Sequence, residues 1–154
     1  MTKLYLIFIL ILFISCNDNS VTEDRYVFNV GLIKPVEQHI LKLNIINKDS
    51  IIDYNYKAKD SNKNFGFRYF SNKDILAGDG IFKYKKKDIV FKKLKFKIYG
   101  YSESGLVSHP RFILFRKDYG IIASVAYGAE FLFLNDTIID KNHVQLFDKI
   151  IEKL

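Results

Sequence analysis

The residues that could catalyse a reaction or bind a metal are few and widely spaced. The three histidines, His39, His109 and His143, are scattered, and no two of them stand at ligand spacing. A structural zinc site needs four ligands, commonly cysteine or histidine, so we expect no bound metal. Ser102 lies in a glycine-containing segment, but Gly105 stands three residues after it, where the hydrolase elbow requires a spacing of two. A hydrolase built on Ser102 and His109 is therefore the weakest functional hypothesis.

Other catalytic signals are missing from the sequence as well. The chain contains no glycine-rich phosphate-binding motif, and its acidic residues are dispersed. No pair of carboxylates is marked by its spacing as a hydrolytic pair. We therefore predict a non-enzymatic protein without a cofactor.

The single cysteine, Cys16, follows a segment typical of a secretory leader. Lys3 gives a positive start, residues 4–14 carry no charged or strongly polar side chain, and Ser15 is a small residue directly before the cysteine. Residues 13–16 resemble the lipobox of bacterial lipoproteins, although that family usually has leucine where this chain has phenylalanine. The resemblance implies that signal peptidase II cuts before Cys16, which becomes the diacylglyceryl-modified N-terminus.

This resemblance predicts the organisation of the chain. It implies a signal peptide over residues 1–15, a lipidated tether over 16–24 and one domain over 25–154. The eleven apolar residues of the leader would rise only about 16 Å as a helix, whereas a bilayer core needs roughly 20 residues. A transmembrane anchor is thus disfavoured, and an ordinary signal peptide with an incidental cysteine is the other alternative. We expect a lipid anchor in a bacterial envelope membrane, the outer rather than the inner.

Lysine residues form the densest charge in a chain of formal net charge +7. Lys93, Lys95 and Lys97 alternate with apolar residues, so a strand would place the lysines on one face. One hypothesis is a cationic strip that contacts anionic lipid headgroups or an acidic envelope protein. The alternative is a solvated or lysine-guarded edge, which prevents sheets from pairing edge to edge. Nucleic acid is not expected as a partner in an envelope compartment.

Two short motifs could carry a modification. Residues 49–51 and 136–138 each place Ser50 or Thr137 between an aspartate and an isoleucine. They resemble the Asp-Ser/Thr-apolar acceptor used for O-glycosylation of envelope proteins in Bacteroidota. Ordinary polar turns are the alternative explanation, because aspartate and serine both favour turns.

The elements that must position these residues are mainly strands. Residues 26–32, 52–57 and 64–69 alternate between apolar and polar side chains, and 39–46 fits a strand better than a helix. An aspartate recurs just before the apolar runs, at positions 49, 74, 88, 118 and 136, as expected for polar turns. An antiparallel meander follows, in the form of a sandwich or a half-open barrel.

The last third of the chain has a different pattern. Residues 112–115, 121–126 and 131–134 are apolar at nearly every position, which is typical of strands covered on both faces. A helix over about 143–153 supplies the second cover, since its apolar residues recur at helical spacing. We expect Phe147 and Ile151 to be buried against the strands that contain Phe112 and Phe131.

These features lead to two main hypotheses of function. The first is a non-enzymatic binding or assembly lipoprotein that contacts another envelope component. The second is a carrier that holds a small apolar ligand in a cupped sheet, for which 14 Phe and 10 Tyr provide ample aromatic surface. The sequence does not identify the ligand or the protein partner.

Overall fold

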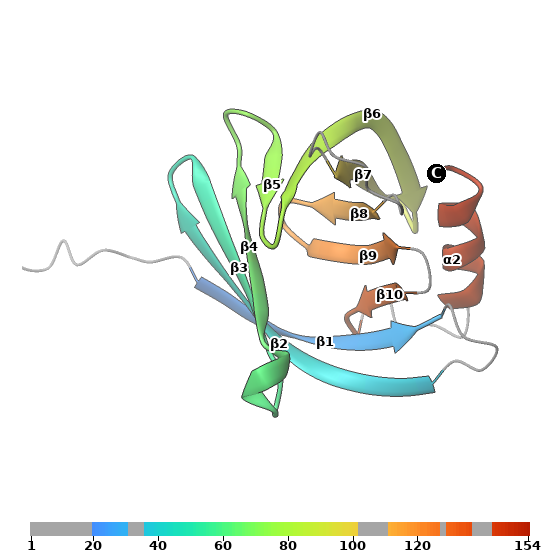
Figure 1. The fold of residues 1–154 in the computed structure, drawn as a ribbon, viewed down its shortest axis with the longest axis horizontal. Coiled ribbons are helices and arrows are strands. Elements are labelled where there is room, and N and C mark those ends of the chain that lie inside the picture. Colours follow the sequence, from blue (N-terminus) through green and yellow to red (C-terminus); the bar gives the residue numbers. More distant parts are fainter. Residues whose placement is uncertain (1–19, 31–35, 102–110, 127–128, 137–142) are drawn as a thin grey trace, which may run out of the picture.

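The computed structural model describes residues 20–30, 36–101, 111–126, 129–136 and 143–154. In this part of the chain, ten antiparallel strands follow one another in sequence order, and a helix follows the last strand (Figure 1). The predicted fold class, a mainly β antiparallel meander with a C-terminal helix, is therefore confirmed.

The elements have the following bounds. The strands are β1 (Ser20–Asn29), β2 (Val36–Lys48), β3 (Ile51–Lys57), β4 (Phe65–Phe70), β5 (Ile75–Ala77), β6 (Ile81–Phe91), β7 (Leu94–Tyr101), β8 (Arg111–Arg116), β9 (Gly120–Ala126) and β10 (Ala129–Leu134). A 3₁₀ turn, η1 (Ser61–Lys63), lies between β3 and β4, and the helix is α2 (His143–Ile151). No helix among the described residues is long and apolar enough to span a membrane.

The sheet closes on itself, because β1 pairs with both β2 and β10. The closed barrel replaces the sandwich and the half-open barrel that the sequence left as alternatives. The strand β1 also begins earlier than predicted, although the pairs that close the barrel lie within its predicted part, Tyr26 to Asn29. β1 begins at Ser20, which pairs with Ile46, so residues 20–24 belong to the sheet and the tether predicted over 16–24 is wrong for them. Their polar composition resembles that of a linker, but a strand with one solvated face is also polar on alternate residues.

Alternate side chains of the strands form two apolar layers. One layer fills the barrel interior and includes Leu43, Tyr54, Tyr99 and Phe115, all at most 1% exposed. The other covers the outside of β6 to β10 and packs under α2. The strands of the last third are thus buried on both faces, as their continuous apolar runs predict.

The helix has the predicted position but presents a different face. Leu146 and Ile150 are 1% and 0% exposed in the outer layer, whereas Ile151 is 48% exposed and Phe147 is half-buried. The burial of Ile151 was therefore predicted wrongly. The strands that contain Phe112 and Phe131 do belong to the layer under α2, through Phe112, Leu132 and Leu134, although the Phe131 ring itself faces the interior. Ile150 and Leu154 share the helical spacing of Phe147 and Ile151, and Ile150 is the member that is fully buried. The error is therefore confined to the side of the apolar face that carries Ile151.

The predicted turns are present at Asp49, Asp74, Asp118 and Asp136, but not at Asp88. Asp88 lies within β6, where the pairing register shifts between Tyr84 and Asp88 and Lys86 has a φ of 57°. Residues 85–87, between the paired Tyr84 and Asp88, are therefore a bulge in one long strand, which bends it.

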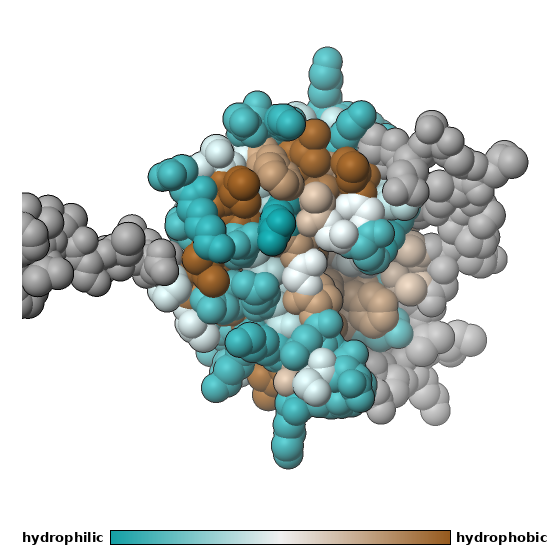
Figure 2. All heavy atoms as spheres, turned by 60° about the vertical axis from the view of Figure 1, so that its left-hand side comes forward, coloured by the Kyte–Doolittle hydropathy of each residue, from teal (hydrophilic) through white to brown (hydrophobic). Residues whose placement is uncertain are grey.

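The outer surface mixes charged and apolar residues. Figure 2 shows a face on which hydrophobic residues gather between hydrophilic ones. The large exposed apolar residues include Ile40, Ile81 and Val90, at 54%, 46% and 61% exposure.

Candidate binding cavity

The strand connections divide the barrel into two ends. Consecutive strands of a meander run in opposite directions, so the ends of β1, β3, β5, β7 and β9 and the starts of β2, β4, β6, β8 and β10 lie at one end. We call this the cavity end. The other end carries the connections β2–β3, β4–β5, β6–β7 and β8–β9 together with Ser20 at the start of β1, and we call it the turn end.

A cavity of about 750 Å³ lies at the cavity end. Its volume falls within the roughly 300–1,000 Å³ of typical small-molecule sites. Its deeper wall is made of apolar side chains that point inward from most of the strands. These are Val27, Leu41, Phe65, Phe67, Leu76, Phe82, Ile113, Ile121, Phe131 and Phe133.

Aromatic rings on neighbouring strands pack against one another in this wall. The Phe65 ring stacks on Tyr56 with their centroids 4.5 Å apart, and Phe133 meets both rings edge-on, each at 5.8 Å. Pairs of this geometry are favourable beyond the area that they bury. The wall is therefore held in place by its own contacts.

Two glycines allow close packing beside the cavity. A Cβ on Gly66 would lie 2.9 Å from the backbone oxygen of Tyr54, and one on Gly78 would lie 3.2 Å from Cβ of Phe67. Backbone oxygen atoms cannot move aside easily, so Gly66 is the position where a side chain is excluded. Both glycines line the cavity.

Polar and charged residues surround the entrance to the cavity. They are His39, Lys59, Asp60, Lys63, Asp79, Arg111 and Ser124. Two of the acids are engaged locally: Asp79 forms an ion pair with Arg111, and Asp60 accepts a hydrogen bond from the Asn62 N–H at 3.1 Å. The Arg111 guanidinium also lies over the Phe82 ring, 5.5 Å from its centroid.

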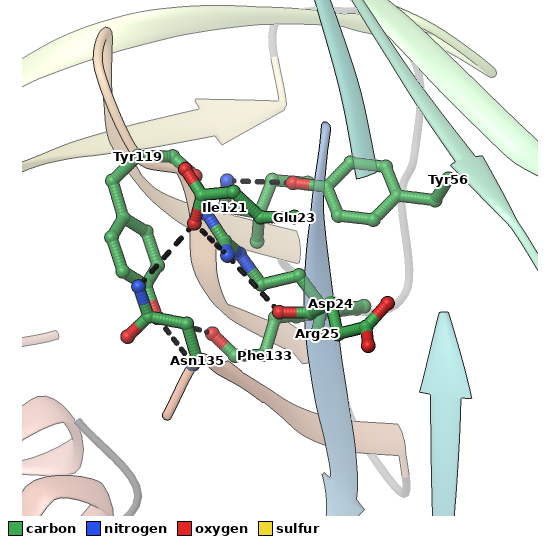
Figure 3. A network of polar contacts seen from close by, with 8 residues as sticks. All are labelled: Glu23, Asp24, Arg25, Tyr56, Tyr119, Ile121, Phe133 and Asn135. Carbon is green, nitrogen blue, oxygen red and sulfur yellow. Dashed lines mark hydrogen bonds and ion pairs between the residues drawn. The ribbon is translucent and has the colours of Figure 1, made fainter. Parts of the chain in front are cut away.

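The turn end, in contrast, is sealed by a buried arginine (Figure 3). The Arg25 side chain is 0% exposed. It donates to Glu23 at 2.5 Å and to the Tyr119 carbonyl at 2.7 Å, and its guanidinium lies 4.3 Å from the Tyr119 ring centroid. The Nε–H of Arg25 has no hydrogen-bond partner among the described atoms. Charge compensation by Glu23 and stacking on Tyr119 allow this cation to remain in the interior.

The buried hydroxyls of Tyr119 and Tyr56 both bond to the backbone. Tyr119 donates to the Phe133 carbonyl at 3.0 Å and accepts from the Asn135 N–H at 3.1 Å (Figure 3). The Tyr56 hydroxyl accepts from the Ile121 N–H at 3.0 Å. Burial raises the pKa of Tyr119 to about 12 and raises that of Tyr56 further. These hydroxyls therefore stay protonated at neutral pH and act as structural groups.

Asp74 provides a second polar seal at the turn end. Tyr69 and Tyr99 donate to its Oδ1 at 3.0 and 2.5 Å, and Lys97 binds its Oδ2 at 2.6 Å. Burial acts to raise the pKa of this carboxyl, but the hydrogen bonds from Lys97, Tyr99 and Tyr69 outweigh it, and the pKa is lowered. The ionised Asp74 carboxylate thus binds three side chains at once.

The predicted lysine strip is only partly a free cationic surface. As predicted, Lys95 and Lys97 point to the opposite face from the buried Phe96. However, Lys95 pairs with Asp88 at 2.8 Å and Lys97 with Asp74, so their charges are compensated. Lys93 lies in the β6–β7 turn with a φ of 67° rather than in the strand.

Most of the other predicted site residues lie outside the described part of the chain. These are Cys16, Ser102, His109 and Thr137. Ser50 lies in the exposed turn between β2 and β3, where an attached sugar would meet no obstruction from the core. The described residues contain no group of three or more histidine, cysteine or acidic side chains that could hold a metal.

The sequence offered an apolar pocket as one hypothesis, but it did not predict which residues line it, the buried Arg25 or the Asp74 seal. Arg25 was taken as the first residue of the domain, although its alternation with Val27 could have placed both on one face. The aromatic residues carried a further signal: a buried tyrosine needs a partner for its hydroxyl, whereas phenylalanine can line an empty apolar space. The cavity is lined by phenylalanines and not by the described tyrosines, and this difference is the signal that could have located it.

Comparisons of this chain with protein-family models, with curated proteins and with solved structures found no match.

Proposed function

We propose that this chain is a non-enzymatic envelope lipoprotein that binds a small apolar molecule inside its barrel. The observation that carries the proposal is the cavity of about 750 Å³, whose deeper wall is apolar. Transfer of an apolar ligand from water into such a site is favourable by about 25 cal/mol per Å² of buried apolar surface. This is the second of the two hypotheses from the sequence, and the cavity favours it over an assembly module.

The polar interior groups support binding rather than catalysis. Arg25, Asp74 and the tyrosine hydroxyls at the turn end all serve contacts that hold strands together. None of them lines the cavity. The wall itself offers rings and aliphatic side chains, which can exclude water from a ligand but cannot transfer a proton to it.

The anchor is proposed from the leader alone. The lipobox resemblance at residues 13–16 supports lipidation of Cys16 and attachment to an envelope membrane, which we take to be the outer one. Glycosylation at Ser50 and Thr137 remains a separate proposal, which the intact mass of protein from its native host would test.

Binding can be tested with a variant that fills the cavity. Val27 lines the cavity and is 7% exposed, whereas Val90 is 61% exposed on β6, so Val27→Phe and Val90→Phe make the same change in two settings. Native mass spectrometry of the wild-type domain should show a retained ligand, and the uncharged dye Nile red should bind to the emptied protein. We expect Val27→Phe to weaken dye binding at least about tenfold, because the added ring occupies the ligand volume.

Val90→Phe is the matched control and should bind the dye as the wild type does. Equal dye affinity of the Val27→Phe variant, with its fold intact, would show that the dye binds elsewhere. Wild-type protein with neither a retained ligand nor dye binding would contradict the proposed function.

A further inference from the structure

The charges at the entrance to the cavity are not balanced locally. Asp79 is paired with Arg111, and Asp60 is bonded to the backbone of the η1 turn. The side chains of Lys59 and Lys63 are exposed beside the same entrance and form no ion pair or hydrogen bond in the part of the chain that the structure describes. Three cations, Lys59, Lys63 and Arg111, face two carboxylates, Asp60 and Asp79, so the entrance carries a net positive charge where the cavity meets solvent.

Local hydrogen bonds hold the segment that carries these lysines. The Ala58 N–H donates to the Asn64 side chain at 2.8 Å, and the Lys63 N–H donates to the Asp60 carbonyl at 3.1 Å. These bonds close the connection around η1 on both sides of the turn. The ammonium groups are thus carried by a defined backbone at the entrance.

An apolar cavity with a cationic entrance is complementary to a particular class of ligand. We infer that the ligand is a single-chain amphiphile with an anionic head, its apolar chain inside the barrel and its carboxylate or phosphate beside Lys59 and Lys63. This inference rests on the proposed binding function and specifies its ligand. A cationic head would be opposed by the net positive charge of the entrance, and an uncharged head would gain no electrostatic contact with the two lysines.

The first experiment compares ligands that differ only in the head. Isothermal titration calorimetry measures the binding of three compounds of the same chain length, each below its critical micelle concentration. They are a long-chain carboxylate, the corresponding alcohol and the corresponding trimethylammonium compound. We expect the carboxylate to bind about three- to tenfold more tightly than the alcohol, which is the range for one or two exposed ion pairs. The preference should shrink as salt is added, because exposed charges are screened.

The second experiment assigns this preference to the entrance. In the double variant Lys59→Gln, Lys63→Gln, the carboxylate and the alcohol should bind equally, with the alcohol affinity unchanged. The matched control Lys73→Gln, Lys117→Gln removes the same charge from exposed turns at the turn end and should keep the preference. The conservative variant Lys59→Arg, Lys63→Arg retains the charge and should keep it too.

The outcomes separate this inference from the function on which it rests. If wild-type protein binds none of the three amphiphiles, the proposed binding function fails. If it binds the carboxylate and the alcohol equally, or the trimethylammonium compound most tightly, binding stands and the anionic head is wrong. The role of Lys59 and Lys63 would also be overturned if the Lys73→Gln, Lys117→Gln control lost the preference for the carboxylate equally. Loss of that preference in the Lys59→Arg, Lys63→Arg variant would overturn it as well. An alkyl phosphate of the same chain length, titrated in parallel, distinguishes a phosphate head from a carboxylate head.

Discussion

At the scale of single residues, five phenylalanines line the cavity, whereas none of the described tyrosines does. Tyr54, Tyr69 and Tyr99 reach hydrogen-bond acceptors at the turn end, and the Phe115 ring packs between them. The phenylalanines of the cavity wall have no polar atom to satisfy, so they can face an empty space. Burial of an unpaired hydroxyl is unfavourable, which is the physical reason why the two residue types separate along the barrel.

The first prediction concerns the buried guanidinium of Arg25. Arg25→Leu removes the bonds to Glu23 and to the Tyr119 carbonyl, and the unfolding free energy should fall by about 2–4 kcal/mol. Arg68→Leu is the control, because Arg68 is 66% exposed in its ion pair with Asp53 and should contribute at most about 1 kcal/mol. Urea unfolding measures both changes. Similar losses for the two variants would mean that Arg25 is not a structural seal.

The second prediction concerns the pH dependence that Asp74 confers. Its pKa is lowered in the folded protein, so its stabilisation is complete above the unfolded value of about 4 and is lost as the pH falls through the folded pKa. Asp74→Asn should therefore lower the unfolding free energy by about 1–2 kcal/mol at neutral pH. The difference from wild type should vanish in acid.

Asp49→Asn is the matched control for that experiment. Asp49 and Asp74 both lie in turns with a φ of 51°, which asparagine tolerates well, so backbone strain is the same in the two variants. A constant difference between Asp74→Asn and wild type across the acid range would show that the carboxylate charge is not the cause.

At the scale of elements, α2 acts as a cover for half of the barrel. It buries Leu146 and Ile150 against the outer faces of the last strands, while the outer faces of β2 to β5 carry solvated residues such as Lys42 and Arg68. Full burial of a leucine or isoleucine contributes about 1.5–3 kcal/mol. The helix is therefore part of the core.

The third prediction distinguishes the two apolar faces of the helix. Ile150→Ala should lower the unfolding free energy by about 2–5 kcal/mol, because Ile150 is fully buried. The adjacent Ile151→Ala should change it by less than about 0.5 kcal/mol, the range for surface residues. Urea unfolding of the two alanine variants measures the difference. A larger loss of unfolding free energy for Ile151→Ala than for Ile150→Ala would show that Ile151 is the buried residue, as predicted from the sequence.

An element could be predicted from the sequence when the residues that determine it are close together in the chain. β2 and β3 were predicted because alternation over seven or more residues is a local signal. The β6 bulge was taken for a turn, because Lys86, Lys87 and Asp88 have the composition of one. Only the partner strand, whose pairing continues on both sides of the bulge, shows that the strand does not end there.

At the scale of the whole molecule, barrel closure and the cavity depend on contacts between distant residues. β1 and β10 are more than a hundred residues apart, and no local pattern in either strand specifies that they pair. The interior volume follows from the number of strands and their tilt. For this reason the sequence predicted a meander and its core, but not the closed barrel or the site that closure creates.

The fourth prediction concerns the anchor. Cys16→Ser should leave an unprocessed precursor and abolish incorporation of labelled fatty acid, because the lipobox cysteine is the lipid acceptor. Metabolic labelling of the native host with a fatty-acid analogue, followed by immunoprecipitation, measures this. The domain itself begins its first strand at Ser20, so the variant should fold and its cavity should bind ligand as before. Normal labelling of the variant would contradict the lipoprotein proposal.

The last prediction combines the anchor with the two ends of the barrel. Ser20 lies at the turn end, and the four residue steps from Cys16 to Ser20 span at most about 14 Å. An anchor at Cys16 should therefore hold the turn end near the membrane and direct the cavity end away from it. A ligand would then exchange with the compartment beyond the anchoring membrane rather than with the lipid directly beneath the protein.

Single cysteines can report this orientation, because Cys16 is the only native cysteine and the proposed lipid would block its thiol. Lys63→Cys places a fluorophore at the cavity end and Lys73→Cys places one at the turn end. A strand of about eight residues spans roughly 26 Å, so energy transfer to an acceptor dye in the bilayer should be much stronger from position 73 than from position 63. Equal transfer from both positions would show that the barrel lies on its side, with the entrance to the cavity beside the membrane.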